Sequence, residues 1–291
     1  LDLVRGESSI HMSSLSAPVL LRADGRVIYT LASVVDDIDH GITTILRGED
    51  HVTNSAAQIQ LFEALGAKPP DLGHMALLAG AEGEGLSKRL GSLSIGQLRE
   101  EGFEPLAIAA LLARIGTSDP IEAFSTFDEI IEQFSIKKFS RSTAKFDPTE
   151  LSLINAKTLQ LLTFNELRDR FSLEGVPEID EAFWEAIKGN IFYFSDIKFW
   201  WQLCNSEIKP IIKDDELCQL AIESMPEGEL TAETWNSWVA LISEKSGKKG
   251  KSLFHPLRLA LTGKTQGPEV KNLLKYMGRE RIRKRLSGIT A

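Results

Sequence analysis

The chain has 291 residues, of which 43% are hydrophobic and 25% are charged. This composition is typical of a soluble globular protein, and the length predicts about two domains. No apolar run approaches the ~20 residues of a membrane-spanning helix, and no signal-peptide pattern opens the chain. Two cysteines are too few for a disulfide framework, and they and five scattered histidines lack zinc-ligand spacing. We therefore expect no structural zinc, no membrane partner and a reducing cytoplasm.

Charge is distributed unevenly along the chain. The net charge is −8, yet residues 245–291 contain 13 basic and 2 acidic residues, a net charge of +11. Residues 1–244 therefore carry −19. An acidic body with a basic end indicates a polyanionic partner at that end. The alternative, which the sequence leaves open for Arg279 to Arg285, is a solvated basic helix.

The N-terminal quarter has the pattern of a mixed α/β fold. Two extended runs flank a tight turn at Asp24-Gly25. The β-branched run 42–46 predicts a buried strand that ends directly in the polar residues 47–51. Because ligands bind at the carboxyl ends of parallel strands, residues 47–51 lie at the expected ligand edge.

A capped helix is expected to follow this strand. Thr53 or Asn54 can serve as its N-cap, and Gly66 as its C-terminal stop. One face of the predicted helix carries Ile59, Phe62 and Leu65. Strand, polar loop and helix in this order form the βα unit of a parallel sheet.

A basic cluster lies in the glycine-rich segment 82–95. Ser87, Lys88 and Arg89 are surrounded there by glycines, which allow a backbone to approach a ligand closely. Adjacent lysine and arginine supply fixed positive charge that suits a polyphosphate. A solvated surface turn is the alternative for this segment alone.

Beyond residue 92 the sequence predicts helices and no strand. Ser94 with Gln97 forms a capping box, and Pro105 opens the next helix. Helical periodicity recurs at 126–134, 149–162, 180–188, 214–225, 231–245 and 268–286. A set of aromatic residues is expected to be buried rather than to form a stacking surface: Phe192, Tyr193, Phe194, Phe199, Trp200 and Trp201.

Several short motifs occur in a single order along the chain. They are Asp24-Gly25-x-x-x-Tyr29, Val34-Val-Asp36-Asp37, Arg47-Gly-Glu-Asp50-His51, Ser87-Lys88-Arg89, Phe146-Asp147-Pro148 with Asn155, Pro256-Leu-Arg258 and Gly267-Pro268. Together they resemble bacterial glutamyl-tRNA synthetase, a class I aminoacyl-tRNA synthetase, from end to end.

The resemblance implies an α/β fold, the C-terminal half of a Rossmann-like class I catalytic domain, followed by all-α stem-contact and anticodon-binding domains. The implied boundaries are 1–98, 99–155 and 156–291. The family's first ATP signature, of the His-Ile-Gly-His type, would precede Leu1. We therefore expect a C-terminal fragment that does not activate glutamate by itself.

The resemblance also implies an ATP-dependent glutamate–tRNA ligase. Such an enzyme activates L-glutamate to glutamyl-adenylate and transfers it to the 3′ end of tRNA-Glu, with Mg²⁺ carried by ATP. Lys88, with Ser87 and Arg89, is the implied catalytic group that stabilises phosphate charge. The implied ATP-binding positions are Leu77, Leu78, Lys88 and Asp50.

Glutamate would be bound by Tyr29 and Arg47, because a guanidinium can hold a carboxylate through two hydrogen bonds. By the residues alone, Tyr29 could equally be an ordinary core tyrosine and Arg47 a salt-bridge partner at a strand end.

The anticodon would meet Arg258, Gly267 and Pro268, beside a group of lysines that supply backbone-directed charge. An arginine that some relatives direct at the third anticodon base has no secure counterpart near residues 188–190. Acceptance of tRNA-Gln beside tRNA-Glu therefore stays open. A monomer is expected.

One position departs from the family pattern. Gly85 replaces the first lysine of the second ATP signature, so one phosphate-directed charge is missing. This leaves an alternative function, a non-catalytic tRNA-binding paralogue that kept the helical region. Retention of Lys88, Arg47 and Tyr29 favours the ligase.

Overall fold

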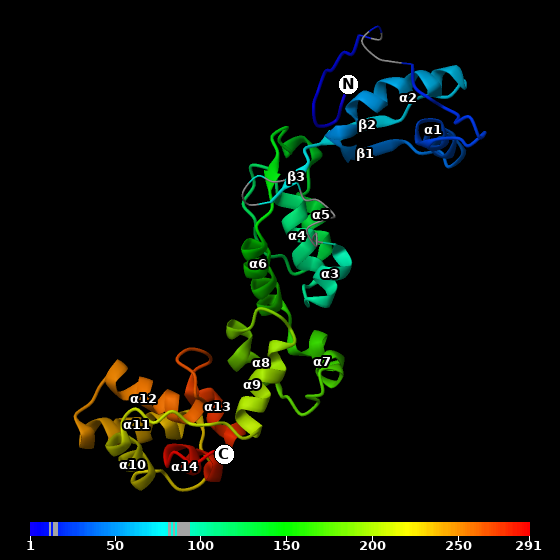
Figure 1. Cartoon of the computed structure of the whole chain (residues 1–291). Helices are drawn as coiled ribbons and strands as arrows, with labels where there is room; N and C mark the ends of the chain where they lie inside the picture. Colours follow the sequence, from blue (N-terminus) through cyan, green and yellow to red (C-terminus); the bar gives the residue numbers. More distant parts are fainter. Residues whose placement is uncertain (12, 14–16, 81–82, 84, 86–93) are drawn as a thin grey trace. The chain divides into compact units, whose positions relative to one another are not determined.

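A computed structural model describes residues 1–11, 13, 17–80, 83, 85 and 94–291 (Figure 1). The predicted catalytic residues Ser87, Lys88 and Arg89 lie outside these described residues. The chain forms two units, one of residues 1–99 and 105–154, the other of residues 100–104 and 155–291. The three-domain division stays a prediction.

The first unit contains the predicted parallel βα unit. Its elements are α1 (Tyr29–Asp39), β1 (Thr44–Gly48), the 3-10 helix η2 (Glu49–His51), α2 (Val52–Ala64) and β2 (Asp71–Met75). β1 and β2 pair in parallel, with Arg47 opposite His74. Leu72 also bridges in parallel to Asp2, so the first residues run along the other edge of β2. The expected strand and its parallel pairing are confirmed, but its predicted burial was wrong: every residue of β1 is exposed or half-buried, and Leu46 is 48% exposed.

The start of α2 differs from the prediction. His51 is the N-cap, no side chain caps the helix, and Thr53 and Asn54 lie inside its first turn. The reason is that η2 leads directly into α2, so the chain is already helical before the capping residues. Gly66 ends the helix as expected, with φ +75°. Leu65 is 53% exposed and does not share the buried face of Phe62.

The rest of the first unit is mostly helical. It comprises β3 (Leu78–Ala79), α3 (Ile95–Glu100), α4 (Pro105–Arg114), α5 (Phe127–Gln133), η4 (Ile136–Lys138), β4 (Ala144–Lys145) and the start of α6 (Pro148–Leu161). The capping bond from Gln97 N–H to Ser94 Oγ is 3.0 Å long, and Pro105 opens α4 as predicted. β4 contradicts the expectation of no strand beyond residue 92. It pairs in parallel with β3 over two residues, too short a run for a periodic signal.

The second unit is helical throughout its described elements. These are α7 (Phe164–Leu173), α8 (Glu181–Ile187), η5 (Lys188–Asn190), α9 (Asp196–Asn205), α10 (Asp215–Glu223), α11 (Ala232–Ser246), α12 (Lys251–Thr262), α13 (Val270–Met277) and α14 (Arg279–Leu286). One apolar cluster joins them, and its largest buried side chains include Trp184 and Trp238. α7, α9 and α12 were not predicted, and Gly278 divides the predicted helix 268–286 into α13 and α14.

Burial of the aromatic group is only partly as expected. Phe194 and Trp200 are buried, whereas Phe192 is 48% exposed and Phe199 is 43% exposed. The Lys264 ammonium lies 5.0 Å from the centre of the Phe199 ring. Burial was therefore wrong for Phe192, which lies just before α9, and for Phe199, which is on the face of α9 turned away from the core.

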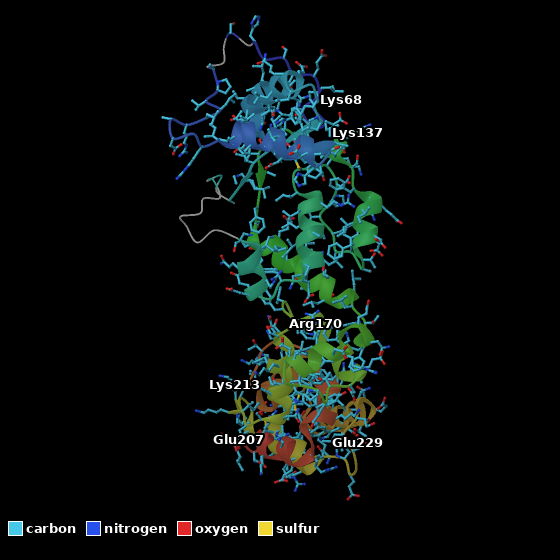
Figure 2. The ribbon with its side chains drawn as sticks, turned by 90° about the vertical axis from the view of Figure 1, so that its right-hand side faces the viewer. Lys68, Lys137, Arg170, Glu207, Lys213 and Glu229 are labelled. Carbon is cyan, nitrogen blue, oxygen red and sulfur yellow. The ribbon has the colours of Figure 1, made fainter. Side chains whose placement is uncertain are left out.

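Buried polar contacts fix the segment 100–104 within the second unit. Arg170, labelled in Figure 2, binds both carboxylate oxygens of Glu104 at 3.1 and 2.6 Å, and its guanidinium lies 4.0 Å from the Phe194 ring centre. Asn155, fully buried, accepts from Glu104 N–H at 2.7 Å and donates to the Phe192 carbonyl at 2.6 Å. The motif residue Asn155 therefore has a structural role.

The described residues contain neither a metal-binding group nor a membrane-spanning helix. In the part of the chain that the structure describes, no three His, Cys, Asp or Glu side chains are grouped to hold a metal ion. Within the same ranges, every helix is too short or too polar to cross a lipid bilayer. Cys204 and Cys218 are free and buried, and burial raises the pKa of the Cys204 thiol to about 12.

Candidate functional site

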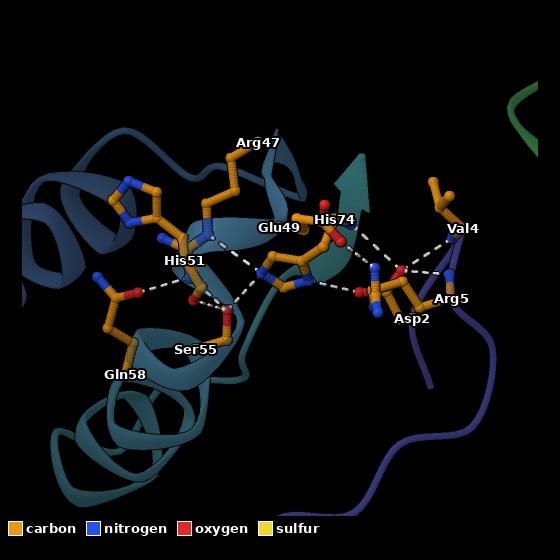
Figure 3. Close-up of polar contacts among 9 residues, drawn as sticks. All are labelled: Asp2, Val4, Arg5, Arg47, Glu49, His51, Ser55, Gln58 and His74. Atoms are coloured by element: carbon orange, nitrogen blue, oxygen red, sulfur yellow. Dashed lines mark hydrogen bonds and ion pairs between the residues drawn. The ribbon is translucent and has the colours of Figure 1, made fainter. Parts of the chain in front are cut away.

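Arg47, at the carboxyl end of β1, is the centre of a polar cluster (Figure 3). Its Nη1 donates to the Tyr29 hydroxyl at 3.0 Å, and its Nη2 donates to Ser55 Oγ at 2.5 Å and to Gln58 Oε1 at 2.7 Å. Tyr29 comes from α1, and Ser55 and Gln58 come from α2. The structure therefore brings together Tyr29 and Arg47, the two residues predicted to bind glutamate.

The guanidinium of Arg47 has no carboxylate partner among the described residues. Its hydrogen-bond partners Tyr29, Ser55 and Gln58 are uncharged. The charge of Arg47 acts on Asp37 only electrostatically, without a hydrogen bond between them. Burial raises the pKa of Asp37, and the charge of Arg47 only partly offsets this effect. A half-buried cation with uncharged partners can accept an anionic ligand without first breaking an ion pair.

A second group of predicted residues meets at the end of β1. A Cβ atom at Gly48 would lie 2.4 Å from Asp50 Oδ1 and 2.9 Å from Leu77 Cδ2, so both side chains would have to move if another residue stood there. Asp50 and Leu77, both predicted to bind ATP, are exposed side by side over this glycine. Leu78, the third, is half-buried in β3 and pairs with Ala144.

Four residues of the Arg47 cluster were missed by sequence reasoning: Asp2, Ser55, Gln58 and His74. Ser55 and Gln58 are each 5% exposed, and His74 is 3% exposed. The signal that could have found Ser55 and Gln58 is their helical spacing with Phe62, which puts two polar residues on the buried face of α2. Asp2 gave no signal, because its contact with His74 joins residues 72 positions apart.

The predicted anticodon residues lie together in the second unit. Arg258, on α12, donates from Nη2 to the Pro268 carbonyl at 2.7 Å. Its Nη1 is buried without a partner among the described residues, and burial lowers the pKa of Arg258. A cavity of about 340 Å³ opens beside it, lined by Trp235, Asn236, Phe254, Arg258, Glu269, Val270 and Lys271.

Gly267 has a steric reason to be glycine. Its φ is +137°, and a Cβ atom would lie 2.3 Å from Cη2 of Trp200. We expect Gly267→Ala to lower the free energy of unfolding by about 2–4 kcal/mol through strain and overpacking. Gly247→Ala is the matched control. Its φ is +70° but the space is open, so a loss of about 1 kcal/mol is expected. Urea unfolding measures both, and equal losses would contradict the clash with Trp200.

The basic end of the chain uses part of its charge internally. Arg281 Nη1 donates to the Cys204 carbonyl at 2.9 Å, and Arg281 Nη2 donates to the Asn205 carbonyl at 3.0 Å. Arg279 donates to the carbonyls of Pro226 and Gly228. Arg285 is fully buried. The sequence alternatives were a solvated helix and a polyanion site, and Arg285 fits neither, whereas Arg279 and Arg281 are half-exposed although they also bind carbonyls.

Comparison with known proteins identifies relatives along the whole chain. Residues 1–153 match the family of class I tRNA synthetases (E and Q), catalytic domain, and residues 211–289 match an anticodon binding domain. Glutamate–tRNA ligase 1 of Maricaulis maris is 49% identical over the whole of this chain, and glutamate–tRNA ligase 2 of Beijerinckia indica is 48% identical. The chain spans 65% of the length of each relative.

A solved structure agrees with these matches. The crystal structure of a glutamate tRNA ligase from Elizabethkingia meningosepticum, in complex with its amino acid, covers 98% of this chain with a TM-score of 0.80 and 25% identity. This chain covers 64% of that structure.

Proposed function

The chain belongs to the class I tRNA synthetases of the E and Q family, and from this membership we propose that it is the larger part of a glutamate–tRNA ligase. In the proposed reaction the carboxylate of L-glutamate attacks the α-phosphorus of ATP to give glutamyl-adenylate and pyrophosphate. The acyl group then passes to the terminal adenosine of tRNA-Glu. The observation that carries the proposal is the Arg47 guanidinium, held by uncharged partners beside the Tyr29 hydroxyl.

Each proposed role follows from the chemistry of the residue. Arg47 would bind one carboxylate of glutamate, and Tyr29 would orient the substrate beside it. Asp50, Leu77 and Leu78 would contact ATP at the neighbouring strand ends. Lys88, assisted by Ser87 and Arg89, would stabilise the charge on the phosphates as pyrophosphate leaves. Mg²⁺ would arrive with ATP.

In the second unit, we propose that Arg258, Gly267 and Pro268 contact the anticodon of tRNA-Glu. The support is the partly unsatisfied guanidinium of Arg258 beside a cavity with aromatic walls, a combination that suits an unstacked base. Discrimination between tRNA-Glu and tRNA-Gln would be decided by charging both.

A tRNA-binding paralogue without catalysis is the second candidate, and Gly85 favours it. A Cβ atom at Gly85 would meet nothing within 4 Å. Among the described residues, therefore, nothing near the Cβ position requires glycine here.

Replacement of Lys88 tests the ligase against the paralogue. In the natural polypeptide that carries these residues, Lys88→Ala is expected to lower glutamate-dependent pyrophosphate exchange by about 100-fold or more. Lys68→Ala, a change at an exposed lysine of the same unit, should stay within about twofold. Unchanged exchange in Lys88→Ala, or none in the wild type, would support the paralogue.

A further inference from the structure

Three hydrogen bonds link Asp2 to Arg47 through two buried side chains (Figure 3). Asp2 Oδ2 lies 2.5 Å from His74 Nδ1, and His74 Nε2 lies 2.6 Å from Ser55 Oγ. Ser55 Oγ in turn accepts from Arg47 Nη2 at 2.5 Å. The residues come from the N-terminal segment, β2, α2 and β1, so the series crosses the whole small sheet.

The carboxylate of Asp2 is fixed before it meets the histidine ring. Its Oδ1 accepts from the backbone N–H groups of Val4, Arg5 and His74 at 2.9, 2.8 and 3.2 Å. Burial alone would raise the pKa of Asp2, but the hydrogen bonds from Arg5, His74 and Val4 outweigh it and hold the pKa below its ordinary value. Asp2 is therefore an ionised acceptor.

An ionised acceptor at Nδ1 selects the histidine tautomer. Nδ1 must carry a proton to donate to Asp2, and a ring with a single proton then has Nε2 as an acceptor. The single proton of the Ser55 hydroxyl has two acceptors within reach, the His51 carbonyl at 3.1 Å and Nε2 at 2.6 Å, and the shorter contact assigns it to Nε2, with the oxygen lone pairs toward Arg47 Nη2. Arg47 Nε also points at His74 Nε2, at 3.4 Å. One carboxylate thereby sets the direction of every hydrogen bond in the series.

We propose that Asp2, His74 and Ser55 are positioning residues that hold the Arg47 guanidinium in the orientation that binds the substrate carboxylate. This rests on the proposed function, in which Arg47 binds glutamate. An arginine side chain loses much rotamer freedom when it binds a ligand, and prior ordering removes this loss from the binding step. The effect is therefore on substrate affinity.

The order carboxylate, histidine, serine is also that of a hydrolytic triad, but Ser55 does not fit a nucleophile. It is 5% exposed, and its oxygen accepts a hydrogen bond from a cation. A cation there draws electron density from the oxygen that would attack.

The first test reads the tautomer and needs no activity. Long-range ¹H–¹⁵N spectra of the 291-residue chain should show His74 protonated at Nδ1 and unprotonated at Nε2. Asp2→Asn should shift the ring toward the other tautomer, since an amide can also donate. Arg5→Gln is the control, because it removes the ion pair with Glu49 and keeps the backbone N–H that binds Asp2. A ring protonated at Nε2 in the wild type, or unchanged by Asp2→Asn, would overturn the proposal.

The second test uses the natural polypeptide that carries these residues and separates the substrates. Asp2→Asn, His74→Asn and Ser55→Ala should each raise the KM for glutamate by about tenfold, with the KM for ATP within about twofold. Ser55→Thr should restore the wild-type KM, because it keeps the hydroxyl and a cavity of about 270 Å³ lined by Ser55 leaves room for a methyl group. Equal changes for both substrates, or no rescue by threonine, would indicate a structural role only.

A failure of the positioning role can be distinguished from a failure of the proposed function. If the tautomer is as expected but Arg47→Ala leaves the glutamate KM unchanged, the binding role of Arg47 is wrong and the positioning role falls with it. If Arg47→Ala raises the KM and the three positioning variants do not, Arg47 binds glutamate but Asp2, His74 and Ser55 do not position it. Covalent labelling of Ser55 by a fluorophosphonate would also overturn the positioning role.

Discussion

Arg285→Ala is expected to lower the free energy of unfolding of the second unit by about 3–5 kcal/mol. The guanidinium is fully buried and has four carbonyl partners: Ala291 at 2.8 Å from Nε, Leu261 at 2.9 Å from Nη1, and Leu203 and Ser206 at 2.8 and 2.9 Å from Nη2. Truncation would remove the donor of the Leu203, Leu261 and Ser206 carbonyls, leave the Ala291 carbonyl with only the Ile208 N–H at 3.0 Å, and open a cavity in the core.

The measurement is urea unfolding followed by tryptophan emission. All five tryptophans lie between residues 184 and 238, so their emission reports on the second unit alone. Arg283→Ala, an exposed position on the same helix, should change the stability by less than about 0.5 kcal/mol. Arg285→Lys should lose an intermediate amount, because an ammonium cannot reach all four carbonyls. Equal stability of the two alanine variants would contradict the assigned role of Arg285.

Arg47→Ala is expected to lower kcat/KM for glutamate by at least about 100-fold, a loss of about 3 kcal/mol in transition-state stabilisation. Arg47→Lys should recover only part of this, since a lysine cannot form two parallel hydrogen bonds to a carboxylate. Glutamate-dependent pyrophosphate exchange of the natural polypeptide measures both variants.

The control for Arg47 is Arg26→Gln, whose side chain is 79% exposed and lies outside the cluster. It should stay within about twofold of the wild type. A drop in Arg47→Ala that is equal for glutamate and ATP would assign the arginine to folding of the α1–β1–α2 region instead. No drop at all would remove the main support for the ligase.

The local sequence pattern predicted those helices and strands whose defining residues lie close together in the chain. The β-branched run before Arg47 is a strand, and Gly66 and Pro105 end and begin helices as expected. α12 escaped prediction because Pro256 interrupts its pattern, and burial of residues such as Leu253 and Leu257 outweighs the lost hydrogen bond. β4 was not predicted because a strand of two residues is too short to show an alternating pattern.

The residues of the candidate site also divide into those that could be predicted from the sequence and those that could not. The resemblance to a known family pointed to Tyr29 and Arg47, and they are in direct contact. The buried series from Asp2 to Ser55 was not predicted, because a strand register brings Arg47 opposite His74 and no periodicity encodes that register. Polar contacts over long sequence separation become visible only with the fold.

The internal use of Arg279, Arg281 and Arg285 changes what the formal charge of +11 means for RNA. Cations already bound to backbone carbonyls are poor partners for phosphates, so fewer counterions would be released when a polyanion binds. The dependence of log Kd on log salt concentration should therefore be shallower than the basic residue count alone implies.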